Sequence, residues 1–295
     1  MYTFIAEEQA NPDCAWSVAQ MCRVLEVSRS GFYDWQSRPP SDREVTDRQL
    51  AAEIEAIWEC SARTYGAPRV HAWLRRQGWR VARRRVARIM REHGWAGVMG
   101  RIRVRTTRRD TTAAPAPDLL ARGFNPDAPD RLWAGDVTYL RTAQGWLYLA
   151  TVIDLYSRRV VGWALADHLR AELVCDALTM AVATRGGHVD GVVFHSDRGC
   201  QYTSRQFRRL CARTGVAQSM GATGVCWDNS PSEAFFATLK RELVHRYTWA
   251  TRRAVRLAAV RWIEGWYNPR RLHSSISYLS PIEKEDSYLQ ISRAA

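Results

Sequence analysis

Residues 132–140 read Leu-Trp-Ala-Gly-Asp-Val-Thr-Tyr-Leu, an apolar run typical of a buried strand, with Asp136 inside it. An unpaired carboxylate is costly to bury, so this aspartate indicates a function. Two further carboxylates stand in distinctive contexts: Asp197 follows the strand-like run 192–196, and Glu233 opens an amphipathic helix. Brought together, two strand-end aspartates and one helix glutamate form the all-oxygen pocket that hard divalent cations prefer.

The pattern around these carboxylates is that of an α/β fold. We expect strands at 132–140, 146–154, 159–165, 191–196 and 216–220, with helices at 171–184, 203–214 and around Glu233. Three consecutive strands with short connections form an antiparallel meander. Followed by alternating helices and strands, they predict an RNase H-like sheet in which strand one lies beside strand four. The two aspartates then meet at the centre of the sheet.

Positive charge is concentrated in one block of the chain. Between Ser61 and Asp110 fifteen arginines face only two acidic residues, so this block alone carries +13, the net charge of the whole protein. Segregated charge of this kind is typical of proteins that bind a polyanion, whereas a solvated helix face usually carries both signs. We therefore expect nucleic-acid binding, and a phosphodiester is the natural substrate for a metal pocket on such a protein.

The basic block predicts a helix-turn-helix followed by an extended arm. One helix is expected at 68–77 and a second at 81–93, separated by Gly78, and the arm covers 101–109. The arginines expected to contact DNA are Arg83, Arg84, Arg85, Arg88 and Arg91 on the second helix and Arg101, Arg103 and Arg105 in the arm. A less basic pattern at 17–35 predicts either another helix-turn-helix or a small helical packing unit.

Composition divides the chain into five parts. Four of the eleven prolines fall between 110 and 130, which is typical of a linker. We expect an N-terminal all-helical segment at 1–48, the basic helix-turn-helix region with its arm at 49–109, the linker at 110–130, the catalytic core at 131–245 and a C-terminal extension at 246–295.

Cysteine spacing and hydropathy narrow the class of protein. The seven cysteines include no Cys-x-x-Cys pair, which favours neither a zinc site nor a disulfide framework. No apolar run approaches the roughly 20 residues that a membrane helix needs. The N-terminus lacks the basic start and apolar stretch of a signal peptide. We expect a soluble, cytoplasmic protein.

Phosphodiester chemistry suggests a role for each acidic residue. In-line attack needs an activated oxygen and a stabilised leaving oxygen, and two metal ions roughly 3.5–4 Å apart supply both. Asp136 is the best candidate to bridge two ions, with Asp197 and Glu233 flanking it. Lys240, one of only two lysines, lies two helical turns beyond Glu233 on the same face. It is expected to hold the DNA end, and a solvated surface lysine is the alternative.

Each of these residues also has a structural alternative. Asp197 precedes an Arg-Gly turn, which it would then merely start. Glu233 completes a Ser230-Pro-Ser-Glu233 capping box and would then only cap its helix. His195 is either a ligand or base, or an ordinary hydrogen-bonding group at a strand end. Asp154 is expected to be structural.

Several motifs are long and specific. They include His195-Ser-Asp-Arg-Gly-Cys-Gln-Tyr-Thr-Ser204, Cys226-Trp-Asp-Asn229, Glu233-Ala-Phe-Phe-Ala-Thr-Leu-Lys240 and Tyr267-Asn-Pro-Arg-Arg-Leu-His273. Together they closely resemble the transposases of IS-three-family insertion sequences, specifically the downstream-frame (OrfB) product. The resemblance extends upstream through the basic helix-turn-helix and covers almost the whole chain.

The resemblance implies a retroviral-integrase-like catalytic core with a DDE triad that falls on Asp136, Asp197 and Glu233, and a helix lysine at Lys240. It implies two Mg²⁺ ions per active site, for which Mn²⁺ substitutes, cleavage at element ends and strand transfer by the released 3′-hydroxyl. The implied partners are DNA (terminal inverted repeats and target), the upstream-frame (OrfA) product or a fusion with it, and further copies of the chain on DNA. The implied location is the bacterial nucleoid.

Two departures from the family pattern stand out. Ala234 occupies a position that is commonly serine. The upstream-frame portion and its leucine zipper are absent from this sequence, so the chain alone is expected to lack part of the machinery for end recognition. Two other functions compete with the transposase: a non-catalytic DNA-binding regulator of transposition, and an RNase H-like nuclease that cuts without joining.

Overall fold

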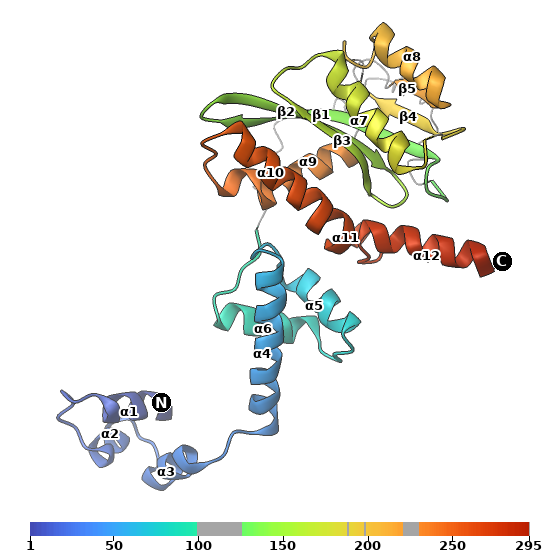
Figure 1. The fold of residues 1–295 in the computed structure, drawn as a ribbon. Helices are drawn as coiled ribbons and strands as arrows, with labels where there is room; N and C mark the ends of the chain where they lie inside the picture. The colour runs from blue at the N-terminus through green and yellow to red at the C-terminus, as the bar shows by residue number, and fades with distance from the viewer. Residues whose placement is uncertain (99–125, 188, 198, 221–229, 295) are drawn as a thin grey trace, which may run out of the picture.

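The computed structural model describes residues 1–98, 126–187, 189–197, 199–220 and 230–294 (Figure 1). A small helical cluster at the N-terminus is followed by a second helical unit and then by an α/β core. Among the described residues, none of the helices combines the length and the apolar character that crossing a bilayer requires.

The N-terminal cluster consists of α1 (Tyr2–Ala10), α2 (Val18–Val24) and α3 (Arg29–Ser37). Ser17 and Ser28 cap the second and third of these helices through their side chains. Ile5, Met21 and Phe32 form its small buried core. The pattern at 17–35 is therefore a pair of short helices, and its use as a DNA reader stays a prediction.

The second unit is a three-helix arrangement of α4 (Asp42–Cys60), α5 (Ala67–Arg76) and α6 (Arg83–Glu92). Apolar residues at helical spacing face inward and bury a core that includes Leu50, Ile54, Val70, Leu74, Val86 and Ile89. Ser41 begins α4 with a capping box, so this helix runs through position 48, where composition places a boundary. The predicted arm and most of the predicted linker lie outside the described residues.

The core is built on a five-stranded sheet in the order β3-β2-β1-β4-β5. Its strands are β1 (Leu132–Thr142), β2 (Gly145–Asp154), β3 (Val160–Ala166), β4 (Val193–Ser196) and β5 (Ala217–Met220). The first three strands are antiparallel, and β4 runs parallel to both β1 and β5. These pairings confirm the predicted meander and the predicted neighbourhood of strands one and four.

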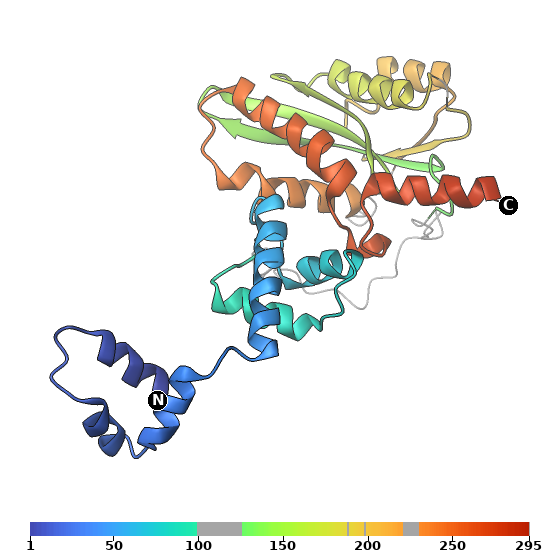
Figure 2. The same cartoon turned by 60° about the horizontal axis from the view of Figure 1, so that its bottom comes forward.

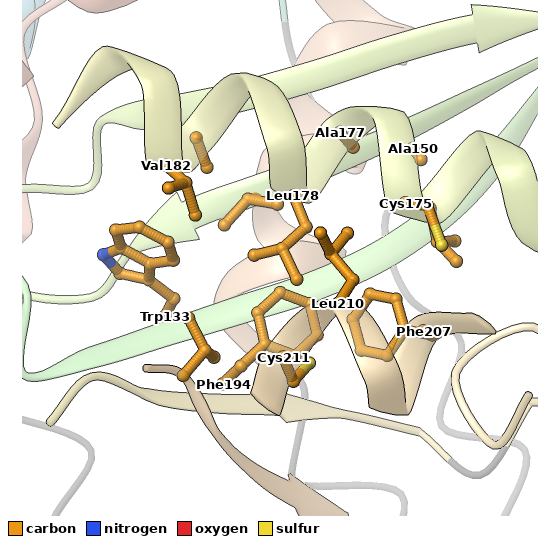
Figure 3. Packing of buried hydrophobic residues seen from close by; sticks show 14 of the residues in the cluster. Trp133, Ala150, Cys175, Ala177, Leu178, Val182, Phe194, Phe207, Leu210 and Cys211 are labelled. Carbon is orange, nitrogen blue, oxygen red and sulfur yellow. The ribbon is translucent and has the colours of Figure 1, made fainter. Parts of the chain in front are cut away.

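One face of the sheet is covered by α7 (Ala171–Thr184) and α8 (Arg205–Thr214). Figure 3 shows the buried residues between them and the sheet, among them Trp133, Leu178 and Phe207. At Gly162 on β3, a Cβ atom would come within 2.2 Å of the backbone carbonyl oxygen of Ala177 on α7. Glycine there lets helix and sheet pack closely.

The other face carries α9 (Ser230–Glu242) and α10 (Arg252–Trp262), which bury Phe235, Leu239 and Trp262 against the sheet (Figure 2). Shorter elements complete the chain: a 3-10 turn at Val244–Arg246, a π-helical turn at Ile263–Tyr267, α11 (Asn268–Arg270), a 3-10 turn at Ser274–Ile276 and α12 (Pro281–Ala294).

The C-terminal segment is tied tightly to the core. The amide of buried Asn268 accepts from the backbone N–H of Val160 and donates to its carbonyl, satisfying the edge of β3. The carboxylate of Glu285 on α12 accepts hydrogen bonds from Arg159 and Arg185. The predicted division at residue 245 stays a prediction, but α10 and α12 pack as parts of the core.

The second helical unit contacts the core through the segment around Leu272. The hydroxyl of Tyr65 accepts from the Leu272 N–H at 2.8 Å, and Arg69 Nε donates to the Leu272 carbonyl at 3.1 Å. Arg246 donates to the carbonyl of Ala62 at 2.5 Å. These contacts join the second helical unit to the segment around Leu272 and to the turn that follows α9.

Candidate active site

Asp136 lies in the middle of the sheet, on β1. It pairs with Thr151 of β2 and is half-buried. Strand side chains alternate between faces, so Asp136 shares its face with Ala134 and Leu140, which pack in the cluster that contains α9. Its Oδ1 accepts a hydrogen bond from the Val137 N–H at 2.7 Å.

Asp197 follows β4 directly and lies next to Asp136 in register. The parallel pairing of β1 and β4 runs to Ala134 opposite His195, and each aspartate stands two residues further along its chain. Asp197 is exposed, and its Oδ1 accepts from the Gly199 N–H at 3.0 Å. It therefore does start a turn, as the structural alternative requires, while lying beside Asp136.

Glu233 stands in the first turn of α9, exposed, on the helix that covers the Asp136 face of the sheet. Electrostatics connects it to the aspartates. The pKa of Asp136 is raised to about 6, mainly by burial and further by the negative charges of Asp197 and Glu233, against the opposing effect of the Val137 N–H. Asp197 and Glu233 are therefore close enough to act on the Asp136 carboxyl.

Lys240 acts on the same carboxyl with the opposite sign, because its charge lowers the pKa of Asp136. Its Nζ lies 5.1 Å from the centre of the Tyr139 ring, and this ring meets Trp146 edge-on at 5.1 Å. Both rings are exposed. Sequence reasoning missed this aromatic pair, although two outward-facing aromatics flanking the first β-turn are a readable signal.

The donors fit a hard divalent cation in kind, since all are carboxylate oxygens. The pKa of Asp136 is raised mainly by burial and further by the two neighbouring carboxylates, an effect that the charge of Lys240 offsets only in part. Within the described residues, no three acidic, histidine or cysteine side chains form a finished metal cluster. The carboxylates thus approach one another without closing around a common point.

Close packing under the site supports its geometry. A Cβ atom on Gly135 would lie 2.1 Å from the Phe194 ring, so glycine lets β1 and β4 hold both aspartates at close range. Phe194 packs against the ring of Tyr202, which is buried. Burial, then the charges of Asp136 and Asp197, raises the pKa of Tyr202 well above its usual value. Tyr202 is a packing residue beneath the carboxylates.

For His195 and Asp154, the structure gives contacts that are typical of structural residues. His195 is buried, and its Nδ1 lies 3.2 Å from the Ser219 hydroxyl. Asp154 is buried and accepts from the N–H groups of Asp130 and Ser157 and from the Ser157 hydroxyl, as a structural residue does. The capping role of Glu233 depends on Ser230, whose side chain lies outside the described part of the chain.

Of the arginines predicted to bind DNA, those that the structure describes form a paired group and an exposed group. Arg85 and Arg88 each donate to Asp47 at 2.6 Å, and Arg88 also pairs with Glu92. Sequence reasoning missed Asp47 as the residue that engages these two arginines. The exposed arginines of α6 are Arg83, Arg84 and Arg91. The arm arginines Arg101, Arg103 and Arg105 lie outside the described residues.

Comparison with known proteins agrees with this architecture. Family models match at residues 44–103 (HTH-like domain), 126–226 (integrase core domain) and 214–281 (a second integrase core domain model). Transposase InsF for insertion sequence IS3A of Escherichia coli (strain K12) is 38% identical over 98% of this chain and 99% of its own length. A 31 kDa protein of insertion element IS600 from Shigella sonnei is 36% identical over 92% of this chain and 99% of its own length.

A solved structure of the HTLV-2 integrase catalytic core domain in complex with magnesium is 15% identical, with a TM-score of 0.41, covering 54% of this chain and 98% of that one. The integrase-core matches confirm an RNase H-like α/β core preceded by a helical, HTH-like region. Because the identity to transposase InsF extends over nearly both full lengths, the chain belongs to the IS3 family of insertion-sequence transposases.

Proposed function

We propose that this protein is a DNA transposase that cleaves insertion-sequence ends and joins them to target DNA through the carboxylates of Asp136, Asp197 and Glu233. One observation carries the proposal: β1 pairs in parallel with β4, so that Asp136 and Asp197 lie side by side, and α9 with Glu233 in its first turn covers the same face of the sheet. The pKa of Asp136 is raised as well, and perturbed carboxyls of this kind cluster at catalytic sites.

The carboxylates of Asp136, Asp197 and Glu233 would hold two Mg²⁺ ions. When bound, the ions supply activation of the attacking oxygen and stabilisation of the leaving oxygen. Asp136, fixed within a strand, sets the position of the site. Asp197 and Glu233, both exposed, are free to close on it when DNA arrives.

The substrate we propose is DNA carrying the terminal inverted repeats, together with target DNA. Exposed Arg83, Arg84 and Arg91 on α6 suit phosphate contacts. Lys240 stands beside the carboxylates and suits a phosphate or base at the DNA end. Assembly with further copies of the chain and with an upstream-frame product belongs to the same proposal.

The test is the exchange Asp197→Asn, because this side chain is exposed and its loss leaves packing intact. DNA cleavage should fall roughly a thousand-fold or more, while DNA binding stays near that of the wild type. Asp176→Asn, an exposed aspartate on α7, is the matched control and should keep activity. Unchanged cleavage in Asp197→Asn would exclude this carboxylate from catalysis, whereas a wild type that binds the DNA ends without cutting or joining them would favour the non-catalytic regulator.

A second assay separates a transposase from a nuclease. Donor duplexes with free 3′-hydroxyl ends are incubated with a plasmid target and Mg²⁺. Covalently joined donor–target products are expected, and they should disappear in Asp197→Asn. Nicked plasmid without joined product would identify a nuclease and contradict strand transfer.

A further inference from the structure

A cavity of about 430 Å³ lies against α9 on the side of the second helical unit. Its walls come from segments far apart in the chain: α5, the turn after β2, α9 and the stretch after α11. Its lining includes Arg69, Arg158, Ala234, Arg271 and His273. Ala234 directly follows Glu233, so an occupant would lie against the helical turn that carries a proposed catalytic carboxylate.

The cavity is lined by positive charge that is only partly compensated. Arg271 is buried and makes a bidentate ion pair with Glu242. Arg69 donates to a backbone carbonyl and Arg158 makes no side-chain hydrogen bond, and neither pairs with a carboxylate among the described residues. Burial lowers the pKa of both, and the Arg271 charge lowers that of Arg69 further.

His273 adds a buried polar atom without a partner. The residue is half-buried, but its Nε2 atom is buried and has no hydrogen-bond partner among the described residues. Its ring stands edge-on to Tyr267 at 4.9 Å. Burial, then the Arg271 charge, lowers its pKa well below the usual range, so the neutral imidazole is the form that faces the cavity. A neutral imidazole can donate one N–H to an anionic oxygen.

The backbone conformation of Arg158 is a second, independent observation about this cavity. Its φ angle is +66°, in the left-handed region that glycine occupies at little cost. A non-glycine residue held there is strained, and such residues cluster at functional sites. The strained residue of this turn is an arginine that lines the cavity.

We propose that this cavity binds a phosphate group of the DNA substrate, through Arg69, Arg158 and His273. Two uncompensated guanidinium groups and a neutral N–H donor match the acceptor oxygens of a phosphate diester. The phosphate site itself stands on the cavity alone, while the assignment to DNA rests on the proposed function. A strand anchored here would run past the first turn of α9 toward the carboxylates.

The first experiment uses inorganic phosphate as the probe. Thermal unfolding of the full chain is followed in sodium phosphate and in sodium chloride at equal ionic strength. Phosphate should raise the unfolding temperature of the wild type, and Arg158→Gly should weaken the apparent affinity roughly ten- to a hundred-fold. The glycine relieves the left-handed backbone, so this variant is expected to fold.

Arg63→Gly is the matched control. Arg63 also has a left-handed φ angle, +61°, but it is exposed and pairs with Glu59. This variant should keep the full response to phosphate. A wild type that responds equally to phosphate and chloride would overturn the proposal, and so would an undiminished response in Arg158→Gly. Arg69→Lys, which keeps the charge, should retain part of the response.

The second experiment identifies the source of the phosphate. Duplexes from the ends of the element that carries this gene are made with one neutral methylphosphonate at successive backbone positions. One position should weaken binding by the wild type and have no further effect in Arg158→Gly. Phosphate binding that depends on Arg158 without any coupled DNA position would overturn the DNA assignment and point to a free phosphate. Asp197→Asn should keep both responses, so failure of catalysis and failure of this site are told apart.

Discussion

Two regions of the core bury negative charge in opposite ways. On α12, Glu285 is buried and pairs with Arg159 and Arg185; we call these three residues the C-terminal anchor. Burial raises the pKa of Glu285, but the Arg185 and Arg159 contacts outweigh it, so the net pKa is lowered. In the proposed active site, burial and two neighbouring carboxylates raise the pKa of Asp136 to about 6.

The difference separates a structural site from a functional one. The C-terminal anchor contains its own counter-charges and is complete within the chain. The pKa of Asp136 stays raised although the Val137 N–H and the charge of Lys240 both lower it, so its surroundings favour the arrival of a cation. Buried charge that is paired holds the fold together, whereas buried charge left unpaired is a feature that function retains.

Breaking the C-terminal anchor should have the largest effect on stability. Glu285→Ala removes the carboxylate that Arg159 and Arg185 share. Among the described residues, Arg185 is then left with Asp130 alone. Removal of one partner from a buried pair costs about 3–5 kcal/mol. Urea unfolding of the core should therefore shift strongly to lower denaturant concentration. Asp286→Ala, the exposed neighbour on α12, should stay within about 0.5 kcal/mol of the wild type. Equal shifts in the two variants would show that the anchor is not what stabilises the core.

Neutralising Asp136 should increase the stability of the protein, in contrast to the loss of Glu285. With its pKa at about 6, the ionised form is disfavoured in the folded state, so Asp136→Asn should raise the free energy of unfolding by about 2 kcal/mol at neutral pH without metal. Asp154→Asn is the instructive contrast. Burial raises the pKa of Asp154 as well, but its carboxylate accepts from three donors. An amide would turn its NH₂ toward one of them, at a cost of about 2 kcal/mol that outweighs the relief of a buried charge. If both variants lose stability, the comparison between the two regions fails.

Much of the fold follows from local pattern. Apolar alternation predicts β1 to β3, helical spacing predicts α7 and α9, and the short turns predict the antiparallel order. The neighbourhood of β1 and β4 then brings Asp136 and Asp197 together. Each of these steps uses contacts that are short in sequence or common to a known sheet order.

The features that sequence reasoning missed depend on long-range contacts. Asp47 meets Arg85 and Arg88 about forty residues away, and Glu285 meets Arg185 across a hundred. Counting charges within one stretch of sequence cannot pair such distant residues. The count therefore assigns the basic block more unpaired arginines than the folded chain has. The cavity beside α9 has the same origin, because its walls meet only in the folded chain.

Adding a divalent cation tests the proposed active site, the second region of the comparison. A ligand that binds only the folded state stabilises it, by about 1.4 kcal/mol at ten times its dissociation constant. Mg²⁺ should therefore raise the unfolding temperature of the wild type, and Mn²⁺ should do the same. In Asp136→Asn the increase should largely vanish, whereas in Glu285→Ala, despite its lower starting stability, it should persist. An increase that survives Asp136→Asn would place the metal elsewhere.

Titration gives the finest distinction, because the two carboxyls respond to pH in opposite directions. The lowered pKa of Glu285 means that its contribution is complete above its ordinary value of 4.5 and is lost as the pH falls through the folded pKa. The raised pKa of Asp136 means that its penalty is full above about 6 and is relieved as the pH falls toward 3.8. The stability gained in Asp136→Asn should therefore shrink between pH 7 and pH 4, while the loss in Glu285→Gln should stay constant until the pH drops below 4.5. Unfolding free energies measured across this range for both variants check the prediction. A Glu285→Gln penalty that already declines between pH 7 and pH 5 would mean that this carboxyl is not held ionised by its arginines, and the contrast between a self-contained anchor and an unpaired active site would no longer stand.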